Sequence, residues 1–385
     1  MNTARLSTFA FGAILAATTA FAAAPPPTVH ARSFSATGHA GTMADPWPAA
    51  AIVMAIKTLP RAGGTVIVDN GIWLFDSDQE VSRGNFTLQG SSLNAQLIFT
   101  TGTLKIGAEG TNISNVKISV LTVDQSGADP NALQAIQLWQ CNGCVVSGNQ
   151  FYGHSNGSVA VLIAFGGSNG RIVRNHFVSR AAGGSQLQIN PLGNPLSSNS
   201  GFLVANNHFD SCGILLIGTN NIHVTQNGMD DQTLGNYLNL VWTAAAGGVT
   251  SGILIDYNVF DSTAGLNGMD VSGIPQDLGL RGTVKNITID HNILRGSGPT
   301  IDANDFDPAC LATCSDLDQT FNIKITNNLL DSPSGGSVIN ISGGTFGLVN
   351  GAVVTGNVMP NGAVVPNQIL QDNHSLNVSI SNNTL

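Results

Sequence analysis

Charged residues are scarce in this sequence. They make up 10% of the 385 residues, with 14 Lys and Arg against 23 Asp and Glu, and the formal net charge at pH 7 is −9. Globular domains typically contain roughly 25% charged residues. A chain with so few cations lacks the basic face that non-specific nucleic-acid binding requires, so we expect no nucleic-acid partner. An acidic substrate stays open, because a local group of cations could hold it.

Long hydrophobic runs are lacking after the N-terminus. Residues 1–27 read MNTARLSTFAFGAILAATTAFAAAPPP, in which one Arg precedes an apolar, Ala-rich run that is typical of a secretory signal peptide. The run is too short to span a bilayer well, so we expect no membrane partner. The small residues of Ala20-Phe21-Ala22 predict cleavage after residue 22 and a secreted or periplasmic location. We divide the chain into a signal peptide (1–22), a linker (23–44) and one domain (45–385).

Cysteine is limited to five residues, and disulfides are expected because a secreted chain meets an oxidising compartment. Cys310 and Cys314 flank three residues and are expected to form a small disulfide. Cys141 and Cys144 leave alternatives open. A zinc site would need two further ligands at suitable spacing, which are not evident, and a redox motif is only weakly indicated. Cys212 is expected in the core.

Two features are abundant in the sequence: glycine, with 45 residues, and one recurring sequence motif, called the phrase below. Residues 222–227 read IHVTQN, residues 287–294 read ITIDHNIL, and residues 323–330 read IKITNNLL. Val or Ile always stands three residues before the asparagine of the phrase, and Phe, Met or Leu always stands two residues after it. The asparagines of the phrase are Asn149, Asn175, Asn207, Asn227, Asn258, Asn292, Asn328, Asn357 and Asn383.

The repeat predicts a parallel β-helix. Alternation of apolar and polar residues before the asparagine indicates a strand with one buried face, and a helical solenoid would show apolar residues three and four apart instead. The asparagines are 20 to 36 residues apart, so loops of different length are inserted at fixed corners. Stacked on its copies, each asparagine amide can bond the next one, which predicts an internal Asn ladder. We therefore expect an all-β, right-handed parallel β-helix.

A third strand is expected in most coils, which gives three sheets. The candidate segments are 185–190, 213–218, 237–242, 268–273, 300–305 and 337–342. A solenoid also needs capped ends. Residues Ala49 to Leu59 can form a short amphipathic helix that Pro60 ends, and Gly63-Gly64 then turns the chain into a strand. This segment is expected to be the N-terminal cap.

The opening of the domain resembles that of the pectate-lyase-like superfamily. The matching stretches are AAAIVMAIKTLPRAGGTVIVDNGIWLF (49–75) and NFTLQGSS (85–92), and together with the Asn coils they cover nearly the whole domain. Many members carry further Asp residues before the cap helix, whereas this chain has only Asp45 there. The resemblance implies a single-stranded β-helix that acts on polysaccharides, with a substrate groove along the third strand of each coil. Fold alone does not fix the activity.

The outward residues of the third strands form the candidate site. Between inward apolar neighbours, the outward positions are Gln188, Leu215, Asn239, Asp270, Asp302 and Asn340. Asp270 and Asp302 are expected on adjacent coils, roughly 4.8 Å apart at strand spacing. Two carboxylates at this short distance either share a proton, giving one acid and one base, or bind a cation. A solvated acidic ladder without chemistry is the alternative.

Other polar residues extend this candidate site. Asn304 and Asp305 continue the acidic cluster, while Arg281, Lys285 and Arg295 are expected on loops of the same two coils. Trp242 follows the strand of Asn239 and could line the groove. Candidates on other faces are weaker: the carboxylate pair Asp256 and Asp290, the stacked pair His176 and His208, the outward residues His223 and Lys324, and the basic cluster Arg171, Arg174 and Arg180.

Three functions remain open at this point. As a lyase, the chain would cleave a uronate-containing polysaccharide, with Ca²⁺ held by Asp270 and Asp302 and with Arg281 or Arg295 as the base. As a hydrolase, it would need carboxyls roughly 6.5–9.5 Å apart for inversion, so Asp305 could be the partner. Polygalacturonase motifs are missing apart from Asp230-Asp231. The third function is a non-catalytic glycan-binding surface protein. The oligomeric state is not indicated.

Overall fold

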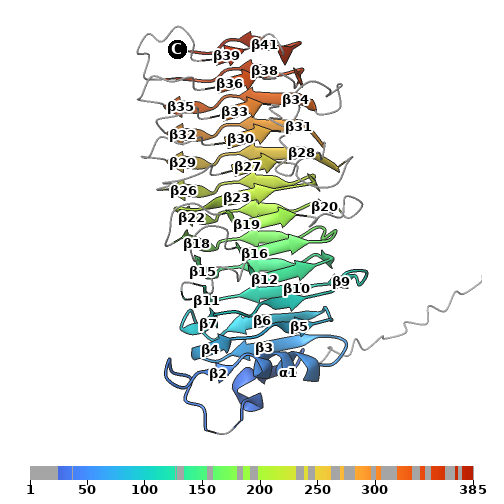
Figure 1. The fold of residues 1–385 in the computed structure, drawn as a ribbon, viewed down its shortest axis with the longest axis vertical. Coiled ribbons are helices and arrows are strands. Elements are labelled where there is room, and N and C mark those ends of the chain that lie inside the picture. The colour runs from blue at the N-terminus through green and yellow to red at the C-terminus, as the bar shows by residue number, and fades with distance from the viewer. Residues whose placement is uncertain are drawn as a thin grey trace, which may run out of the picture.

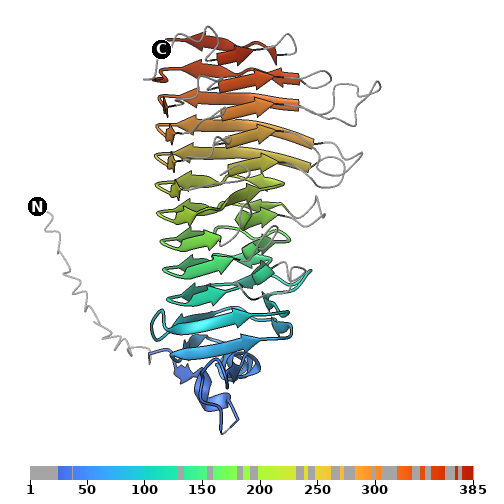
Figure 2. The same cartoon turned by 60° about the vertical axis from the view of Figure 1, so that its left-hand side comes forward.

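The computed structural model describes residues 25–36, 38–125, 127, 134–153, 159–179, 185–190, 198–230, 238–241, 248–261, 269–272, 282–295, 301–304, 319–331, 339–342, 348–359, 369–371 and 375–384. These residues form a tall stack of coils, with the N-terminal cap at one end and the C-terminal coil at the other (Figures 1 and 2). Three long parallel sheets run along the stack. The expected right-handed parallel β-helix with three sheets is confirmed.

Sheet 1 contains the strand that precedes each ladder asparagine. In many coils this strand is split by a bend, so that two short strands follow each other, and a small pair formed by β9 (Ile113–Ser114) and β13 (Cys141–Asn142) lies before the bend. The strands of sheet 1 are β1 (Thr28–His30), β3 (Gly64–Val68), β6 (Phe86–Gly90), β10 (Val116–Ser119), β14 (Val145–Ser147), β17 (Arg171–Val173), β20 (Asn199–Ser200), β21 (Leu203–Ala205), β24 (Thr219–Asn220), β25 (His223–Thr225), β28 (Gly248–Asp256), β31 (Gly282–Asp290), β34 (Gln319–Thr326), β37 (Leu348–Asn350), β38 (Val353–Thr355), β40 (Ser375–Leu376) and β41 (Ser379–Ser381).

Sheet 2 follows the asparagine corner, and sheet 3 follows sheet 2. The strands of sheet 2 are β2 (Trp47–Pro48), β4 (Gly71–Phe75), β7 (Ala95–Phe99), β11 (Thr122–Asp124), β15 (Gln150–Gly153), β18 (His176–Ser179), β22 (His208–Asp210), β26 (Gly228–Asp230), β29 (Val259–Asp261), β32 (Ile293–Arg295) and β35 (Leu329–Asp331). Those of sheet 3 are β5 (Gln79–Val81), β8 (Leu104–Ile106), β12 (Gln134–Trp139), β16 (Val159–Ala164), β19 (Ser185–Asn190), β23 (Gly213–Leu216), β27 (Leu238–Val241), β30 (Met269–Ser272), β33 (Ile301–Asn304), β36 (Ile339–Ser342) and β39 (Ile369–Gln371). The six third-strand segments expected from the sequence are β19, β23, β27, β30, β33 and β36.

The asparagines form a continuous internal ladder between sheets 1 and 2. In each step the side-chain Nδ2 and the backbone N–H of one asparagine both donate to Oδ1 of the next, as Asn207 does to Asn227 at 3.0 and 2.9 Å. The Nδ2 of Asn207 also donates to the carbonyl of Ile172 at 2.9 Å. Every ladder residue from Asn149 to Asn357 is at most 3% exposed. The amides are therefore buried and bonded, which is the condition under which a buried polar column is stable.

Apolar residues stack in register inside the coil. The rings of Phe151, Phe177 and Phe209 lie parallel, with centroids 4.7 and 4.8 Å apart. Phe260 and Leu294 continue this column and are fully buried. The core of these coils arises because the Val or Ile before the asparagine and the bulky residue after it are both buried on each coil from that of Asn149 to that of Asn357.

The residue before each ladder asparagine has a left-handed backbone. From Gly148 to Asn382, φ at this position lies between 53° and 69° in all nine coils. Arg174, Gln226, Tyr257 and His291 are among them, although such a backbone costs L residues about 1 kcal/mol or more. The ladder therefore fixes the corner geometry while leaving the side chain at this position free to vary.

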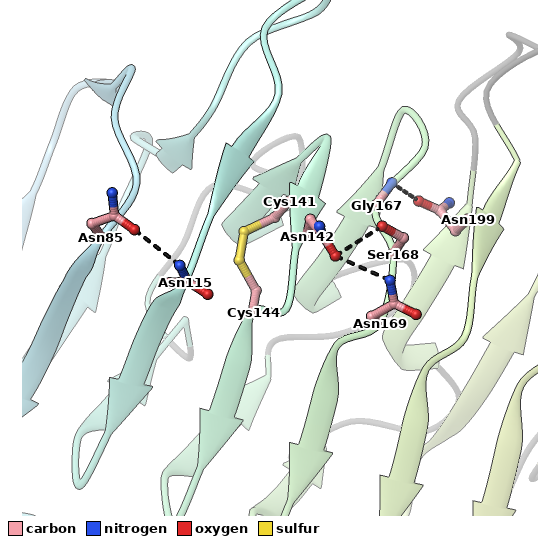
Figure 3. The surroundings of a disulfide bond; sticks show 9 residues. All are labelled: Asn85, Asn115, Cys141, Asn142, Cys144, Gly167, Ser168, Asn169 and Asn199. Carbon is pink, nitrogen blue, oxygen red and sulfur yellow. Dashed lines mark hydrogen bonds between the residues drawn. A yellow bond between two sulfur atoms is a disulfide. The ribbon is translucent and has the colours of Figure 1, made fainter. Parts of the chain in front are cut away.

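A second, exposed asparagine column follows the bend in sheet 1. Asn115 Nδ2 donates to Asn85 Oδ1 at 3.0 Å, and Asn322 Nδ2 donates to Asn286 Oδ1 at 3.1 Å (Figure 3 shows the first pair). All four residues have a positive φ, which asparagine tolerates better than most residues. Glycine replaces asparagine in some coils: a Cβ on Gly252 would lie only 2.7 Å from Asn221 Oδ1.

The cap begins with α1 (Ala50–Thr58), one residue inside each end of the expected helix. Its buried side consists of Ala51, Ile52, Val53, Ala55 and Ile56, which close the end of the core. Arg83 satisfies the free carbonyls at its C-terminus, with Nη1 donating to Leu59 O at 2.7 Å and Nη2 to Pro60 O at 2.6 Å. Strand β1 and the short helix η1 (Ala31–Phe34) lie in the segment 23–44 that the sequence assigns to a linker; β1 pairs with β3.

Candidate functional site

The outward column of sheet 3 is in continuous register. Gln188 pairs with Leu215, Leu215 with Asn239, Asn239 with Asp270, Asp270 with Asp302, and Asp302 with Asn340. The six residues expected to form one column are therefore brought together on neighbouring strands. Asp270 and Asp302 are direct partners on β30 and β33. The inward neighbours Leu187, Ile189, Ile339 and Ile341 are fully buried, and Gln188 and Asn340 are half-buried.

Several candidate residues can be placed only by the backbone or not at all. For Asn239, Asp270, Asp302 and Asn304 the strand position is described and the side chain is not. Other residues named from the sequence lie outside the described residues; they are Arg180, Trp242, Arg281, Asp305, Cys310 and Cys314. The chemical roles of all these residues stay predictions.

Lys285 and Arg295 lie in strands and not in the loops where we expected them. Lys285 lies within β31 of sheet 1, because residues 282–285 extend that strand by pairing with both β28 and β34. Arg295 ends β32 in sheet 2, and its Nη1 lies 3.4 Å from Asp261 Oδ2 on the neighbouring coil. Both cations are thus on other sheets than the Asp270–Asp302 pair, and Arg295 already faces a carboxylate.

The N-terminal part of the same sheet-3 column contains a cluster that sequence reasoning missed. Lys105 Nζ lies 3.8 Å above the ring of Trp139 and 3.5 Å from Glu80 Oε1. The centroid of Phe165 lies 4.1 Å from that of Trp139. Lys105 comes from the preceding coil and Phe165 from the following one, so both faces of the indole are occupied. The alternation in QAIQLW (134–139), with Ile136 and Leu138 inward, could have placed Trp139 outward.

An apolar patch covers the outer face of sheet 3 next to this cluster. Leu162 pairs with Gln137 and Gln188 in the outward column, yet it is fully buried. It packs with Val159, Ala164, Phe165 and partly buried Trp139. The column is therefore not an open groove along its whole length. Polar positions of the column resume at half-buried Gln188, the register partner of Leu162 on the next coil.

The carboxylate pair Asp256 and Asp290 lies on sheet 1, in register and on a different face from sheet 3. Asp256 Oδ1 lies 2.8 Å from His223 Nε2. Burial raises the pKa of Asp290, but hydrogen bonds from Thr326, His291 and Asn327 outweigh it and leave the pKa below its ordinary value. Each carboxylate is thus hydrogen-bonded by its own neighbouring side chains, which favours a structural role.

The imidazoles of His176 and His208 lie beside the ladder on neighbouring strands of sheet 2, with centroids 4.9 Å apart and ring planes tilted by 54°. Burial and the charge of His208 lower the pKa of His176, and Asp210 partly opposes this. His176 Nε2 has no partner among the described residues, whereas His208 Nε2 lies 3.5 Å from Asp230. The expected placement of both residues beside the ladder on adjacent coils is confirmed.

Cys141 and Cys144 form a disulfide at the bend of sheet 1 (Figure 3). The disulfide encloses Asn142, whose Oδ1 accepts hydrogen bonds from Ser168 Oγ and Asn169 Nδ2 at 3.2 and 3.1 Å. Cys212 is fully buried, as expected, and burial raises the pKa of its thiol.

The described part of the chain holds no group of three or more His, Cys, Asp or Glu side chains arranged to bind a metal ion. Within the same residues, no helix has both the length and the apolar character needed to cross a membrane.

Comparisons with known proteins point to the fold. No protein-family model matches the sequence, and a search of curated proteins finds no match. Among solved structures, PfbA, a surface adhesin of Streptococcus pneumoniae, matches with a TM-score of 0.62 at 18% identity, over 86% of this chain and 85% of that one. A hyperthermoactive exopolygalacturonase from Thermotoga maritima matches with a TM-score of 0.64 at 11% identity, over 93% of each chain. An alginate lyase of family PL6, in complex with a trisaccharide, gives 0.52 at 11% identity, over 92% of this chain and 84% of that one.

These likenesses confirm the pectate-lyase-like fold suggested by the opening of the domain. The chain is a right-handed parallel β-helix. Since the identities lie between 11 and 18%, they show the fold alone. The matched proteins include polysaccharide-degrading enzymes and an adhesin, so the activity must be argued from the residues of this chain.

Proposed function

We propose that the protein cleaves a uronate-containing polysaccharide by β-elimination on the outer face of sheet 3. The observation that carries this proposal is the direct pairing of Asp270 with Asp302 on adjacent strands. Two carboxylates at strand spacing, roughly 4.8 Å, repel each other unless they share a proton or a cation. A catalytic or cation-binding role would account for a pair of carboxylates whose mutual repulsion is otherwise destabilising. Export through the signal peptide 1–22 belongs to the proposal.

The neighbouring residues of the column suit a sugar polymer. The amides of Gln188, Asn239 and Asn340 lie in register with the Asp pair and would bind sugar hydroxyls. Asn304, which ends β33, and Trp242, which follows β27, would do the same, whereas Lys285 lies on sheet 1 and is not assigned to this groove. Two matched structures, the exopolygalacturonase and the alginate lyase, act on polyuronates by their names. They support a uronate substrate without fixing the reaction.

The elimination can be written with the residues of this chain. A base removes the C5 proton of a uronate, the electron pair forms a C4–C5 double bond, the C4–O bond breaks, and the leaving oxygen takes a proton and becomes a reducing end. Bound Ca²⁺ would neutralise the uronate carboxylate, and Asp270 and Asp302 supply oxygen ligands of the kind it takes. Arg281 is the preferred base, because Arg295 faces Asp261.

A hydrolase on the same groove is the alternative enzyme. Inversion needs carboxyls roughly 6.5–9.5 Å apart, which is wider than strand spacing. Asp305 would then be the second carboxylate in place of one member of the pair. A non-catalytic glycan-binding role is the second candidate function, and the likeness to a surface adhesin over 86% of this chain favours it.

The test is turnover on a panel of polyuronates. The mature protein is incubated with polygalacturonate, alginate and a neutral glucan, with calcium or with a chelator, and both reducing ends and ultraviolet absorbance of unsaturated products are followed. Absorbance rising together with reducing ends, and lost with the chelator, is the expected result. Reducing ends without absorbance would mean hydrolysis. Binding without either signal would mean a glycan-binding protein.

A further inference from the structure

An open groove of about 400 Å³ lies on the outer face of sheet 1, away from the sheet-3 column. Its floor is formed by Gln89, Ser119 and Ser147, which are in register on β6, β10 and β14. Lys117 lies two residues before Ser119 on the same strand, so the two side chains lie on the same face of the sheet. Arg174 follows β17 on the next coil and lines the other end. The groove therefore places two cations about two to three strand spacings apart across a polar floor.

Among the residues that the structure describes, no carboxylate pairs with either cation of this groove. Lys117 and Arg174 are exposed, and no ion pair among the described residues involves either of them. The chain as a whole has a net charge of −9 and only 14 Lys and Arg. An acid-rich protein that keeps two cations together without acidic partners creates a local site for anions.

The floor contains a hydroxyl that lacks a partner. Ser119 is 3% exposed, and its Oγ has no hydrogen-bond partner among the described residues. A buried hydroxyl without a partner costs free energy, so it marks a place where a ligand or an ordered water bonds. Ser119 lines the groove between Lys117 and Arg174, so this hydroxyl lies next to the position that a ligand bound to the two cations would take.

We propose that this groove binds the acidic sugar of a uronate polymer, as a second site separate from the candidate catalytic column. The planar guanidinium of Arg174 suits bidentate pairing with a carboxylate, and Lys117 adds a second charge. The hydroxyl of Ser119 and the amide of Gln89 bond the sugar hydroxyls. The choice of a uronate polymer rests on the proposed function. The site holds the chain to its polymeric substrate, which raises the effective substrate concentration without new chemistry.

The chain offers matched substitutions for the test. Arg174→Gln places at this corner the residue that Gln226 already provides in a later coil, with φ of 55° against 57°. Lys117→Thr copies Thr87, the register partner of Lys117 on β6. Arg171→Gln is the control, because Arg171 is an exposed arginine three residues from Arg174 that does not line the groove. Ser119→Ala removes only the floor hydroxyl.

Binding of trigalacturonate is measured by calorimetry in a background in which Asp270 and Asp302 are both Asn, so that neither turnover nor the sheet-3 pair contributes. We expect Arg174→Gln and Lys117→Thr to weaken binding about tenfold or more, since each removes a charge-assisted contact, and Ser119→Ala to weaken it several-fold. Arg171→Gln stays within about twofold. Polymer KM rises in the groove variants of the active protein, while kcat on trigalacturonate does not change.

Three results would overturn the proposal. Equal loss in Arg171→Gln would mean diffuse electrostatics instead of a site. Sodium sulfate or inorganic phosphate binding as tightly as trigalacturonate would mean a site for free anions. An oligonucleotide that binds with the same dependence on Lys117 and Arg174 would mean a nucleic-acid surface. Failure of this proposal is distinguishable from failure of the proposed function. If the protein turns over a polyuronate but the groove variants bind trigalacturonate as the parent does, only the groove proposal is rejected. If the groove binds trigalacturonate but the protein shows no turnover, only the proposed enzymatic activity is rejected.

Discussion

Asn258 and Asn292 are joined by two hydrogen bonds to one oxygen: the backbone N–H and the side-chain Nδ2 of Asn258 both donate to Asn292 Oδ1 at 3.0 Å. The residues are 34 positions apart in the chain, yet they lie on neighbouring coils. Because Asn227 bonds Asn258 in the same way, Asn258 accepts two hydrogen bonds from one ladder neighbour and donates two to the other. The ladder thus couples coils whose loops differ in length and sequence.

Removing one ladder asparagine should destabilise the helix strongly. Asn258→Ala leaves the buried N–H of Asn227 without its acceptor and removes the bonds of the Asn258 amide to Val224 O and Asn292. Each orphaned buried group costs about 1–3 kcal/mol, so we expect the free energy of unfolding to fall by about 3 kcal/mol. Urea unfolding followed by circular dichroism measures this.

The exposed column supplies the control for that experiment. Asn322→Gly keeps a residue that tolerates positive φ, as Gly351 does at the equivalent position of the next coil, and it loses only an exposed hydrogen bond. We expect a loss below about 1 kcal/mol. Equal losses for Asn258→Ala and Asn322→Gly would contradict the view that burial makes the inner ladder dominant.

Neutralising either member of the sheet-3 carboxylate pair should abolish most turnover. Asp270→Asn and Asp302→Asn are each expected to reduce kcat by about 100-fold or more, because a general acid, base or metal ligand is lost. Asp331→Asn, the same change on sheet 2, should leave kcat unchanged. Initial rates on the polyuronate that the panel identifies, together with unchanged circular dichroism, give the answer. Normal turnover in both sheet-3 variants would remove the pair from the mechanism.

The stability of the protein should depend on the protonation of His176 on the acidic side of neutrality. The folded-state pKa lies below the ordinary value of 6.5, because burial disfavours the charged imidazole. The unfolded chain therefore binds the proton first as pH falls, and the stability that neutral His176 contributes is present above pH 6.5 and is lost as pH falls through the folded pKa.

His176→Gln tests this pH dependence, since Gln150 already occupies the equivalent position on the preceding coil. The urea midpoint of the wild type should fall more between pH 7.5 and pH 5, two values that bracket the ordinary pKa of about 6.5, than that of the variant. An imidazole resonance of His176 that titrates at or above the ordinary value would refute the assignment.

The cysteines should differ in reactivity. Without reductant, Cys141 and Cys144 should be recovered as one cross-linked peptide, and Cys212 should resist alkylation until the protein is unfolded, because it is fully buried and its thiol pKa is raised. Peptide mapping by mass spectrometry before and after denaturation checks both points. Rapid alkylation of Cys212 in the native protein would contradict its place in the core.

Part of the candidate site followed from alternation alone. A strand exposes every second residue, so once the third strands were located, their outward residues had to form a column, and the register from Gln188 to Asn340 agrees. The prediction that Lys285 and Arg295 lie on loops near the Asp pair was wrong, because closeness along the chain does not determine which sheet a residue joins. Extension of β31 to residue 282 depends on pairing with β28 and β34, neither of which is visible in the local sequence.

The sequence by itself determined the β-helix. Its repeat of Val or Ile, Asn and a bulky apolar residue specifies an inward strand residue, a hydrogen-bonding corner and a second inward residue. These are local properties of the nine coils that contain the repeat. Tertiary structure alone decided which side chains meet across coils. The contact of Lys105 with Trp139, the burial of outward Leu162 and the polar groove between Lys117 and Arg174 arise from stacking of segments 26 to 57 residues apart. Loop lengths between those segments vary, so only the stacked coils fix which residues share a face.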